Sequence, residues 1–185
     1  MLSLNRLRFH YEHVLRQDLL CKYNYANIFQ IPQLSKMLIV AQVSSESVKQ
    51  VTLAFEIVCG QKIVKTEFSQ LRSSRVNKWV SLRAKTKQPT YLVRTCLRAE
   101  SMYNLIDKLV TLLCFHDFAI QIQANAIQLT IKPILLRLFP EIQNHFELFE
   151  NAQSVQIILV TSAQTEQETR LLWTGLYQKE VKQYV

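Results

Sequence analysis

The spacing of apolar residues predicts a helix and then a strand near the start of the chain. Residues 10–23 carry apolar side chains at positions i, i+3, i+4 and i+8, which is the pattern of an amphipathic helix. These side chains are Tyr11, Val14, Leu15 and Leu19. Pro32 favours an extended conformation in the residue before it, so we expect a strand over residues 34–43.

Similar apolar stripes predict three more helices. The first carries Val48, Val51, Phe55 and Val58, with caps offered by Ser44, Ser45 and Ser47. Gly60 stands where a left-handed residue would end this helix. The second covers residues 99–115, with a stripe of Met102, Leu105, Ile106, Leu109, Val110 and Leu113. In the third, Thr165 and Glu168 form a capping box that opens a last helix, which carries Leu171, Leu172 and Leu176.

The remaining segments are typical of strands. QKIVKT (61–66) indicates a short strand, and RVNKWVSLR (75–83) and TYLVRTCLR (90–98) flank KTKQP, which predicts a long hairpin with a cationic tip. FAIQIQ (118–123) and IQLTIK (127–132) alternate strictly, which predicts a second hairpin with its glutamines facing water. SVQIILVTS, from residue 154 to 162, indicates a buried strand.

This order of elements predicts an α+β fold. We expect an antiparallel or mixed sheet with helices packed on one face and a projecting basic hairpin at about residues 67–92. The 185 residues are enough for one domain, over residues 1–185, with a substantial core. The opposite face of the sheet is then open to a ligand as large as RNA.

The distribution of charge adds a candidate partner. The net charge is +8, and residues 62–98 hold ten Lys or Arg and a single acid, Glu67, so this segment carries +9 and the rest of the chain −1. A basic segment on an otherwise neutral domain is typical of a protein that binds a polyanion. The alternative is an ordinary solvated Lys/Arg face.

Composition argues against several other classes of function. The two glycines, Gly60 and Gly175, are too few for a Gly-rich nucleotide loop. The four cysteines (Cys21, Cys59, Cys96 and Cys114) form no CxxC pair, so we expect reduced core thiols and neither a metal site nor a cofactor. The longest apolar run, residues 109–118, is interrupted and too short to cross a bilayer, so no membrane association is expected. Residues 1–8 resemble neither a signal nor a transit peptide, so we expect either a removed presequence or synthesis where the protein works.

Catalytic residues are also missing from the pattern. His116 and Asp117 are adjacent and more typical of a helix end than of a catalytic pair. His10 and His13 share a helix face with no third ligand, and Glu147 and Glu150 lie on one amphipathic turn. We therefore expect no enzyme activity.

The stretch YNYANIFQIPQLSKM, residues 23–37, combines amides and aromatic rings with a single charge. It resembles the N-terminal signature of the universal large-subunit ribosomal protein five family, which binds 5S rRNA in the central protuberance. The positions that match are Asn24, Tyr25, Asn27, Gln30, Pro32, Leu34 and Lys36. Further matches follow in order: Gly60, Gln61, Lys62 and Thr66; Leu97, Arg98 and Met102; Phe139, Pro140, Glu141 and Ile142; Thr161, Ser162 and Ala163.

The resemblance implies a structural RNA-binding protein. The positions it nominates for contacts with 5S rRNA are Asn24, Tyr25, Asn27, Gln30, Gln61, Lys62, Thr66 and Arg98. Tyr25 or Phe29 can stack on an unpaired base, with packing beneath the loop as the alternative. For Asn27 and Gln61 the alternative is turn capping. Cys96 and Glu67 depart from the family, which has a threonine and a basic residue at these positions.

The resemblance also implies a set of partners. The central basic hairpin of the family approaches P-site tRNA, and the residues in that region here are Arg72, Arg75, Lys78, Arg83, Lys85 and Lys87. Large-subunit rRNA, neighbouring central-protuberance proteins and a small-subunit head protein across an intersubunit bridge are further expected partners. The sequence most resembles the versions encoded in plant and protist mitochondria. We therefore expect the protein to be located in the mitochondrial matrix, in the mitoribosome. The alternative is a free-standing organellar RNA-binding or RNA-processing factor on the same fold.

Overall fold

The computed structural model describes residues 5–68, 90–115, 119–144 and 152–177. Within these ranges the chain forms a six-stranded sheet in the order β2-β3-β1-β6-β5-β4, and every neighbouring pair is antiparallel. The strands are β1 (Leu34–Ser44), β2 (Val64–Phe68), β3 (Thr90–Leu97), β4 (Ala119–Ile122), β5 (Ala126–Ile131) and β6 (Ala152–Thr161). The expected α+β fold is confirmed, and the sheet is antiparallel throughout these ranges.

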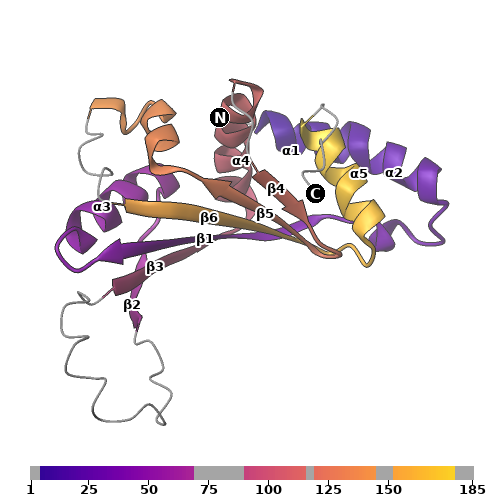
Figure 1. The fold of residues 1–185 in the computed structure, drawn as a ribbon. Helices are drawn as coiled ribbons and strands as arrows, with labels where there is room; N and C mark the ends of the chain where they lie inside the picture. Colours follow the sequence, from indigo (N-terminus) through magenta and orange to yellow (C-terminus); the bar gives the residue numbers. More distant parts are fainter. Residues whose placement is uncertain (1–4, 69–89, 116–118, 145–151, 178–185) are drawn as a thin grey trace, which may run out of the picture.

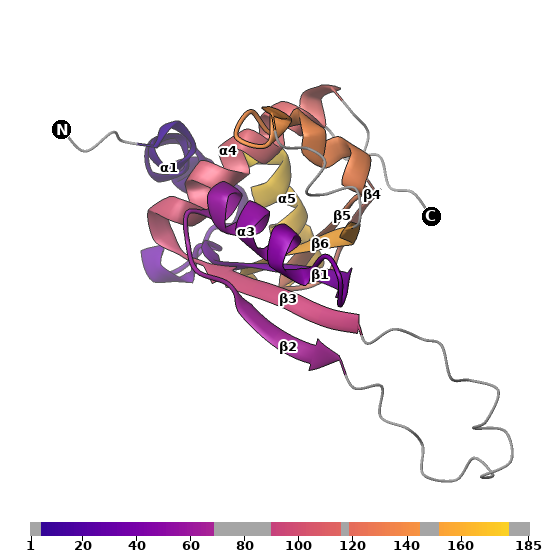
Figure 2. The same ribbon diagram turned by 90° about the vertical axis from the view of Figure 1, so that its left-hand side faces the viewer.

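The helices of the described residues gather on one face of this sheet (Figures 1 and 2). They are α1 (Arg6–His10), α2 (Arg16–Tyr23), α3 (Val48–Cys59), α4 (Ala99–Phe115) and α5 (Glu166–Tyr177). Shorter turns are the π-helical η1 (Tyr11–Leu15) and the 3-10 turns η2 (Ile28–Gln30) and η3 (Pro133–Leu138). None of the described helices is long and apolar enough to span a bilayer.

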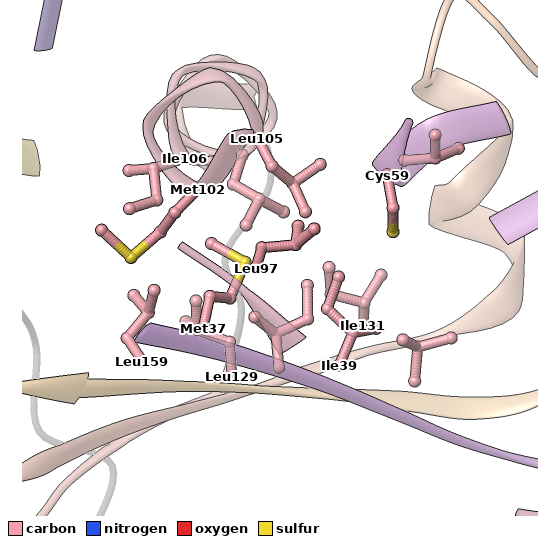
Figure 3. Packing of buried hydrophobic residues seen from close by; sticks show 14 of the residues in the cluster. Met37, Ile39, Cys59, Leu97, Met102, Leu105, Ile106, Leu129, Ile131 and Leu159 are labelled. Atoms are coloured by element: carbon pink, nitrogen blue, oxygen red, sulfur yellow. The ribbon is translucent and has the colours of Figure 1, made fainter. Parts of the chain in front are cut away.

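The core lies between this helical layer and the sheet. Every second residue of β1 faces it, so that Met37, Ile39, Ala41 and Val43 are all buried. The stripe of α4 packs down on these strands, as Figure 3 shows for Met102, Leu105 and Ile106 above Met37 and Leu97. The strict alternation on the sheet and the helical spacing on α4 therefore meet in one apolar layer.

The N-terminal helix is longer than predicted and its buried stripe differs. It begins at Arg6 because Asn5 Oδ1 accepts hydrogen bonds from the N–H groups of Leu7 (3.0 Å) and Arg8 (3.4 Å). Its buried residues, Leu7, Tyr11, Leu15 and Leu19, are spaced by four. The π turn η1 holds more residues per turn than an α-helix and keeps these positions aligned. Val14, predicted in the stripe, is instead 44% exposed.

The turn after α3 also corrects a predicted boundary. Gly60 ends the helix as expected, with φ of 65° and its N–H donating to Glu56 O at 2.8 Å. The N–H of Ile63 then donates to Glu56 Oε1 at 3.2 Å, so residues 61–63 form the turn and β2 begins at Val64, not at residue 61. At the other end of α3, Ser47 is the N-cap residue, but its hydroxyl pairs with the Ser44 hydroxyl at 2.9 Å.

Most of the second half agrees with its predicted elements. The β4–β5 hairpin, the strand β6 and the capping box of α5 are confirmed; the Glu168 N–H donates to Thr165 Oγ1 at 3.3 Å. The buried side of α5 consists of Thr169, Leu172, Trp173 and Leu176, whereas Leu171 is only half-buried. The turn η3 was not predicted. The expected strand at 75–83, the hairpin tip, His116, Asp117, Glu147 and Glu150 lie outside the described residues.

The thiols of Cys21, Cys59 and Cys96 differ in burial. Cys59 is a core thiol, as expected, and burial raises its pKa to about 12. Cys21 is exposed on the outer side of α2, and Cys96 is half-buried on the face of β3 that no described helix covers. The prediction of core thiols is therefore wrong for Cys21 and Cys96, because both strand alternation and helix periodicity turn them away from the core.

Candidate nucleic-acid interface

The face of the sheet opposite the helices is left uncovered by the described helices (Figure 2). Residues paired directly across antiparallel strands point to the same face. In β1 and β3 the pairs on the uncovered face are Leu38 with Cys96, Val40 with Arg94, and Gln42 with Leu92. Pairing of β2 with β3 adds Val64 and Thr66 to this face.

A groove of about 480 Å³ lies on this face at the β1–β3–β2 edge. Its lining residues are Leu38, Val40, Gln61, Lys62, Val64, Leu92, Arg94, Thr95 and Cys96. Two of the eight predicted RNA contacts, Gln61 and Lys62, thus meet here. The groove combines an apolar floor with two cations and an amide, a chemistry suited to riboses and bases with phosphates at the rim.

Arg94 belongs to this groove but was not among the predicted contacts. The signal was present in the sequence, because strict alternation along β3 places Leu92, Arg94 and Cys96 on one face. Counting Arg94 only as part of a basic segment hid its position. The same reasoning applies to Lys36, which pairs with Val160 on the uncovered face of β1.

Thr66 is partly engaged in holding the edge strand. Its hydroxyl donates to Leu92 O at 3.2 Å, so the hydroxyl proton already has a partner within the protein. An RNA hydroxyl or amino group can therefore reach Thr66 only as a donor to the lone pairs of this oxygen.

The predicted loop contacts form a second group, at the start of β1. Asn24 ends α2 in the left-handed region, with φ of 48° and its N–H donating to Leu20 O at 3.0 Å. The N–H of Gln30 donates to Asn27 O at 3.1 Å, which closes η2. Asn27 and Gln30 are both exposed, and the Asn27 side chain caps no N–H of η2. Turn capping is therefore not the role of the Asn27 side chain.

The two aromatic candidates in this loop behave differently. Tyr25 packs against the core, its ring centroid 5.6 Å from that of Tyr23, and its hydroxyl is enclosed. Burial, and next the neighbouring Glu168 carboxylate, raise the pKa of Tyr25. Phe29 is 91% exposed, so packing beneath the loop is the wrong interpretation for Phe29 and the correct one for Tyr25.

The loop is attached firmly to the rest of the molecule. The buried Tyr11 hydroxyl donates to Pro32 O at 3.0 Å. The Gln33 N–H donates to Ser162 Oγ at 3.0 Å, and the Ser162 N–H donates back to Gln33 O at 2.9 Å. These bonds tie the end of the loop to the junction of β6 and α5.

Arg98 lies between the two groups. It is exposed and directly follows β3, where Leu97 pairs with Met37, so Arg98 and Lys36 lie at the same end of the β1–β3 ladder. The loop residues do not line the groove, so the structure places the predicted contacts in two separate patches. The six residues predicted to face tRNA, Arg72, Arg75, Lys78, Arg83, Lys85 and Lys87, lie outside the described residues.

The uncovered face changes character along the sheet. On the β2–β3–β1 half it carries Lys36, Lys62 and Arg94. The strands β4, β5 and β6 contain no charged residue, and their side of this face presents Gln121, Gln128 and Gln156. An α+β protein with helices on one face and a half-cationic opposite face offers an open, positively charged surface to a polyanion.

The chain is similar to known ribosomal proteins over most of its length. The large ribosomal subunit protein uL5m of Reclinomonas americana is 29% identical over 187 residues, covering 93% of this chain and 96% of the relative. The uL5 proteins of Limosilactobacillus reuteri (strain DSM 20016) and Brevibacillus brevis are 26% and 29% identical, covering 93% and 92% of this chain and 96% and 95% of theirs. No family model matches the chain. Over more than nine-tenths of its length the chain is therefore similar to proteins named uL5 of the large ribosomal subunit.

Proposed function

We propose that this protein binds 5S rRNA in the central protuberance of the large ribosomal subunit. The observation that carries the proposal is the groove in which Gln61, Lys62 and Arg94 converge on the uncovered face of the sheet. Lys62 and Arg94 can neutralise phosphates, and Gln61 can hydrogen-bond to riboses or base edges. The exposed amides of Asn27 and Gln30 form a second patch, in the loop that leads into β1.

We further propose that the protein works in mitochondrial translation, in the matrix. The name of the Reclinomonas americana relative, uL5m, supports this compartment, while the bacterial relatives show that the family also serves bacterial ribosomes. The basic residues between β2 and β3 support a contact with P-site tRNA and the small-subunit head. They are Arg72, Arg75, Lys78, Arg83, Lys85 and Lys87.

The first experiment is a salt titration of binding to 5S rRNA and to a length-matched control RNA. Charge alone gives steep, equal salt dependence on both RNAs, whereas specific contacts preserve selectivity at moderate salt. We expect selective binding by the wild type and loss of that selectivity in Asn27→Ala and Gln61→Ala. Gln50→Ala, an exposed amide on α3, is the matched control and should bind like the wild type.

Two results would count against the proposal. Equal binding of both RNAs by the wild type would leave only a general affinity for polyanions. Sedimentation of mitochondrial extracts would distinguish a ribosomal protein from the second possibility, a free-standing RNA-binding factor. A ribosomal protein should co-sediment with large subunits. Recovery in the soluble fraction alone would support the free factor.

A further inference from the structure

Phe29 is the most exposed of the large apolar side chains in the described ranges, at 91%. Its chain neighbour Ile28 is 55% exposed, as is Val64, and both Phe29 and Ile28 lie on the 3-10 turn η2. An aromatic ring with nearly its full surface in water gains nothing from the fold that displays it. A bound partner that covers the ring would recover this free energy.

The turn that carries Phe29 is held in place before any partner arrives. The Gln30 N–H closes η2 onto Asn27 O at 3.1 Å, and Asn24 fixes the entry to the loop with a left-handed φ of 48°. On one side of η2 Tyr25 is packed on the core, and on the other the Tyr11 hydroxyl holds Pro32 O. Ordering costs on binding are therefore low, which favours affinity through a single projecting ring.

The surroundings of Phe29 indicate the chemistry of the partner. Residues 23–35 contain no charged side chain, and Lys22 and Lys36 flank them. The exposed amides of Asn24, Asn27 and Gln30 lie on either side of the ring in the chain. Ile28 beside the ring is also apolar, but the amides around the pair favour a nucleobase, which offers a flat face to stack on and a polar edge for hydrogen bonds.

We propose that Phe29 stacks on an unpaired base of the bound RNA, with Asn27 and Gln30 hydrogen-bonding to the edge of that base. The proposal rests on the RNA-binding function above and adds a subsite that reads unstacked nucleotides. Lys36 and Arg98, at the adjoining end of the β1–β3 ladder, are placed to neutralise the flanking phosphates. Tyr25, the other aromatic candidate, serves as the anchor of the loop.

The test compares Phe29→Leu with Phe29→Trp in the full chain. Leucine keeps the apolar volume and loses the flat ring, so affinity for 5S rRNA should fall about tenfold, while tryptophan should retain it. Binding to a fully paired duplex of equal length should not change in either variant. The matched control is Phe9→Leu, at a half-exposed phenylalanine whose ring is tilted against His13 with centroids 4.2 Å apart.

Fluorescence of the Phe29→Trp variant gives a readout that a purely structural role would not move. Stacking on a base should quench the added tryptophan emission when a single-stranded oligonucleotide or 5S rRNA is added, relative to the wild-type protein. Selective 5S binding by the wild type that is unchanged in Phe29→Leu would overturn the stacking site and leave the proposed function intact. Wild-type binding without selectivity would count against the proposed function instead.

If the wild-type protein binds without selectivity, the fluorescence of the Phe29→Trp variant still tests the stacking site. Quenching of the Phe29→Trp variant by the single-stranded oligonucleotide, but not by the duplex, would support the stacking site on its own. No quenching by either would overturn it. Normal RNA binding by Phe29→Leu combined with loss of incorporation into large subunits would also overturn it, because Phe29 would then meet a protein.

Discussion

Ala99 occupies a backbone conformation that alanine rarely adopts, with φ of 48° at the first residue of α4. This angle turns the chain sharply from β3 into the helix and leaves Arg98 exposed at the end of the ladder. A left-handed residue with a Cβ costs about 1 kcal/mol. Local strain of this kind often accompanies functional positions, and here it adjoins a proposed RNA contact.

We expect Ala99→Gly to stabilise the protein by up to about 1 kcal/mol, because glycine adopts this φ without a steric clash. The free energy of unfolding from urea denaturation checks the prediction. The control is Ala54→Gly in the middle of α3, which should lower the stability by about 1 kcal/mol or more. A fall in the stability of Ala99→Gly equal to that of the control would contradict the proposed strain.

Between elements, an ion pair joins α4 to the segment that follows η3. Lys108 Nζ contacts Glu141 Oε1, and both side chains are about two-thirds buried. Burial by itself would raise the pKa of Glu141, but the hydrogen bond to Lys108, a backbone hydrogen bond and the charge of Lys108 outweigh it and lower the pKa below its usual 4.5. Leu136 of η3 and Phe139, close to Glu141 in the chain, belong to the core.

This contact predicts how stability depends on pH. Because the folded-state pKa of Glu141 is lowered, its stabilisation is present above the unfolded pKa and is lost as pH falls below about 4.5. Glu141→Gln should therefore flatten the acid limb of a plot of unfolding free energy against pH between about 6 and about 3. Glu166→Gln removes an exposed helix-surface pair with Arg170 and should leave the slope close to that of the wild type. An acid limb unaltered in Glu141→Gln would show that the pair is too well solvated to matter.

Over the whole molecule, the fold concentrates cations on one half of one face. Residues 62–98 carry the excess charge of the chain, and the sheet turns Lys62 and Arg94 of this segment toward the same groove. The helical layer on the other face carries acids and bases in pairs, such as Arg6 with Asp107 and Arg8 with Glu12. Attraction for a polyanion is therefore directed to the uncovered face.

This asymmetry predicts that Arg94→Ala weakens binding to 5S rRNA and to control RNA by a similar factor. It should also reduce the slope of log affinity against log salt by about one, because one fewer counterion is released. Lys49→Ala, an exposed cation on α3 in the helical layer, is the control of equal charge change and should keep the wild-type slope. Equal slopes for the two variants would mean that RNA does not approach the groove.

The sequence alone determined the elements whose side chains repeat regularly. Strict alternation in β5 and the helical stripe of α4 each bury one face whatever their neighbours are, so their positions and the α+β class were predictable. The capping box and Gly60 are local signals that need no tertiary contact. The resemblance to the family likewise rested on residues in order along the chain and is confirmed by relatives over 93% of its length.

Only the tertiary structure decided where side chains without a regular pattern are placed. The π turn η1 exposes Val14, and α5 lies so close to it that a Cβ on Gly175 would collide with the Leu15 side chain. Tyr25 is partly buried and Phe29 exposed, although both are aromatic residues of one short loop, and hydrogen bonds from Tyr11 and to Ser162 tie the end of this loop to distant segments. The groove that unites Lys62 with Arg94 exists because strand pairing joins residues that are far apart in the chain. The local sequence does not show which distant residues pair in this way.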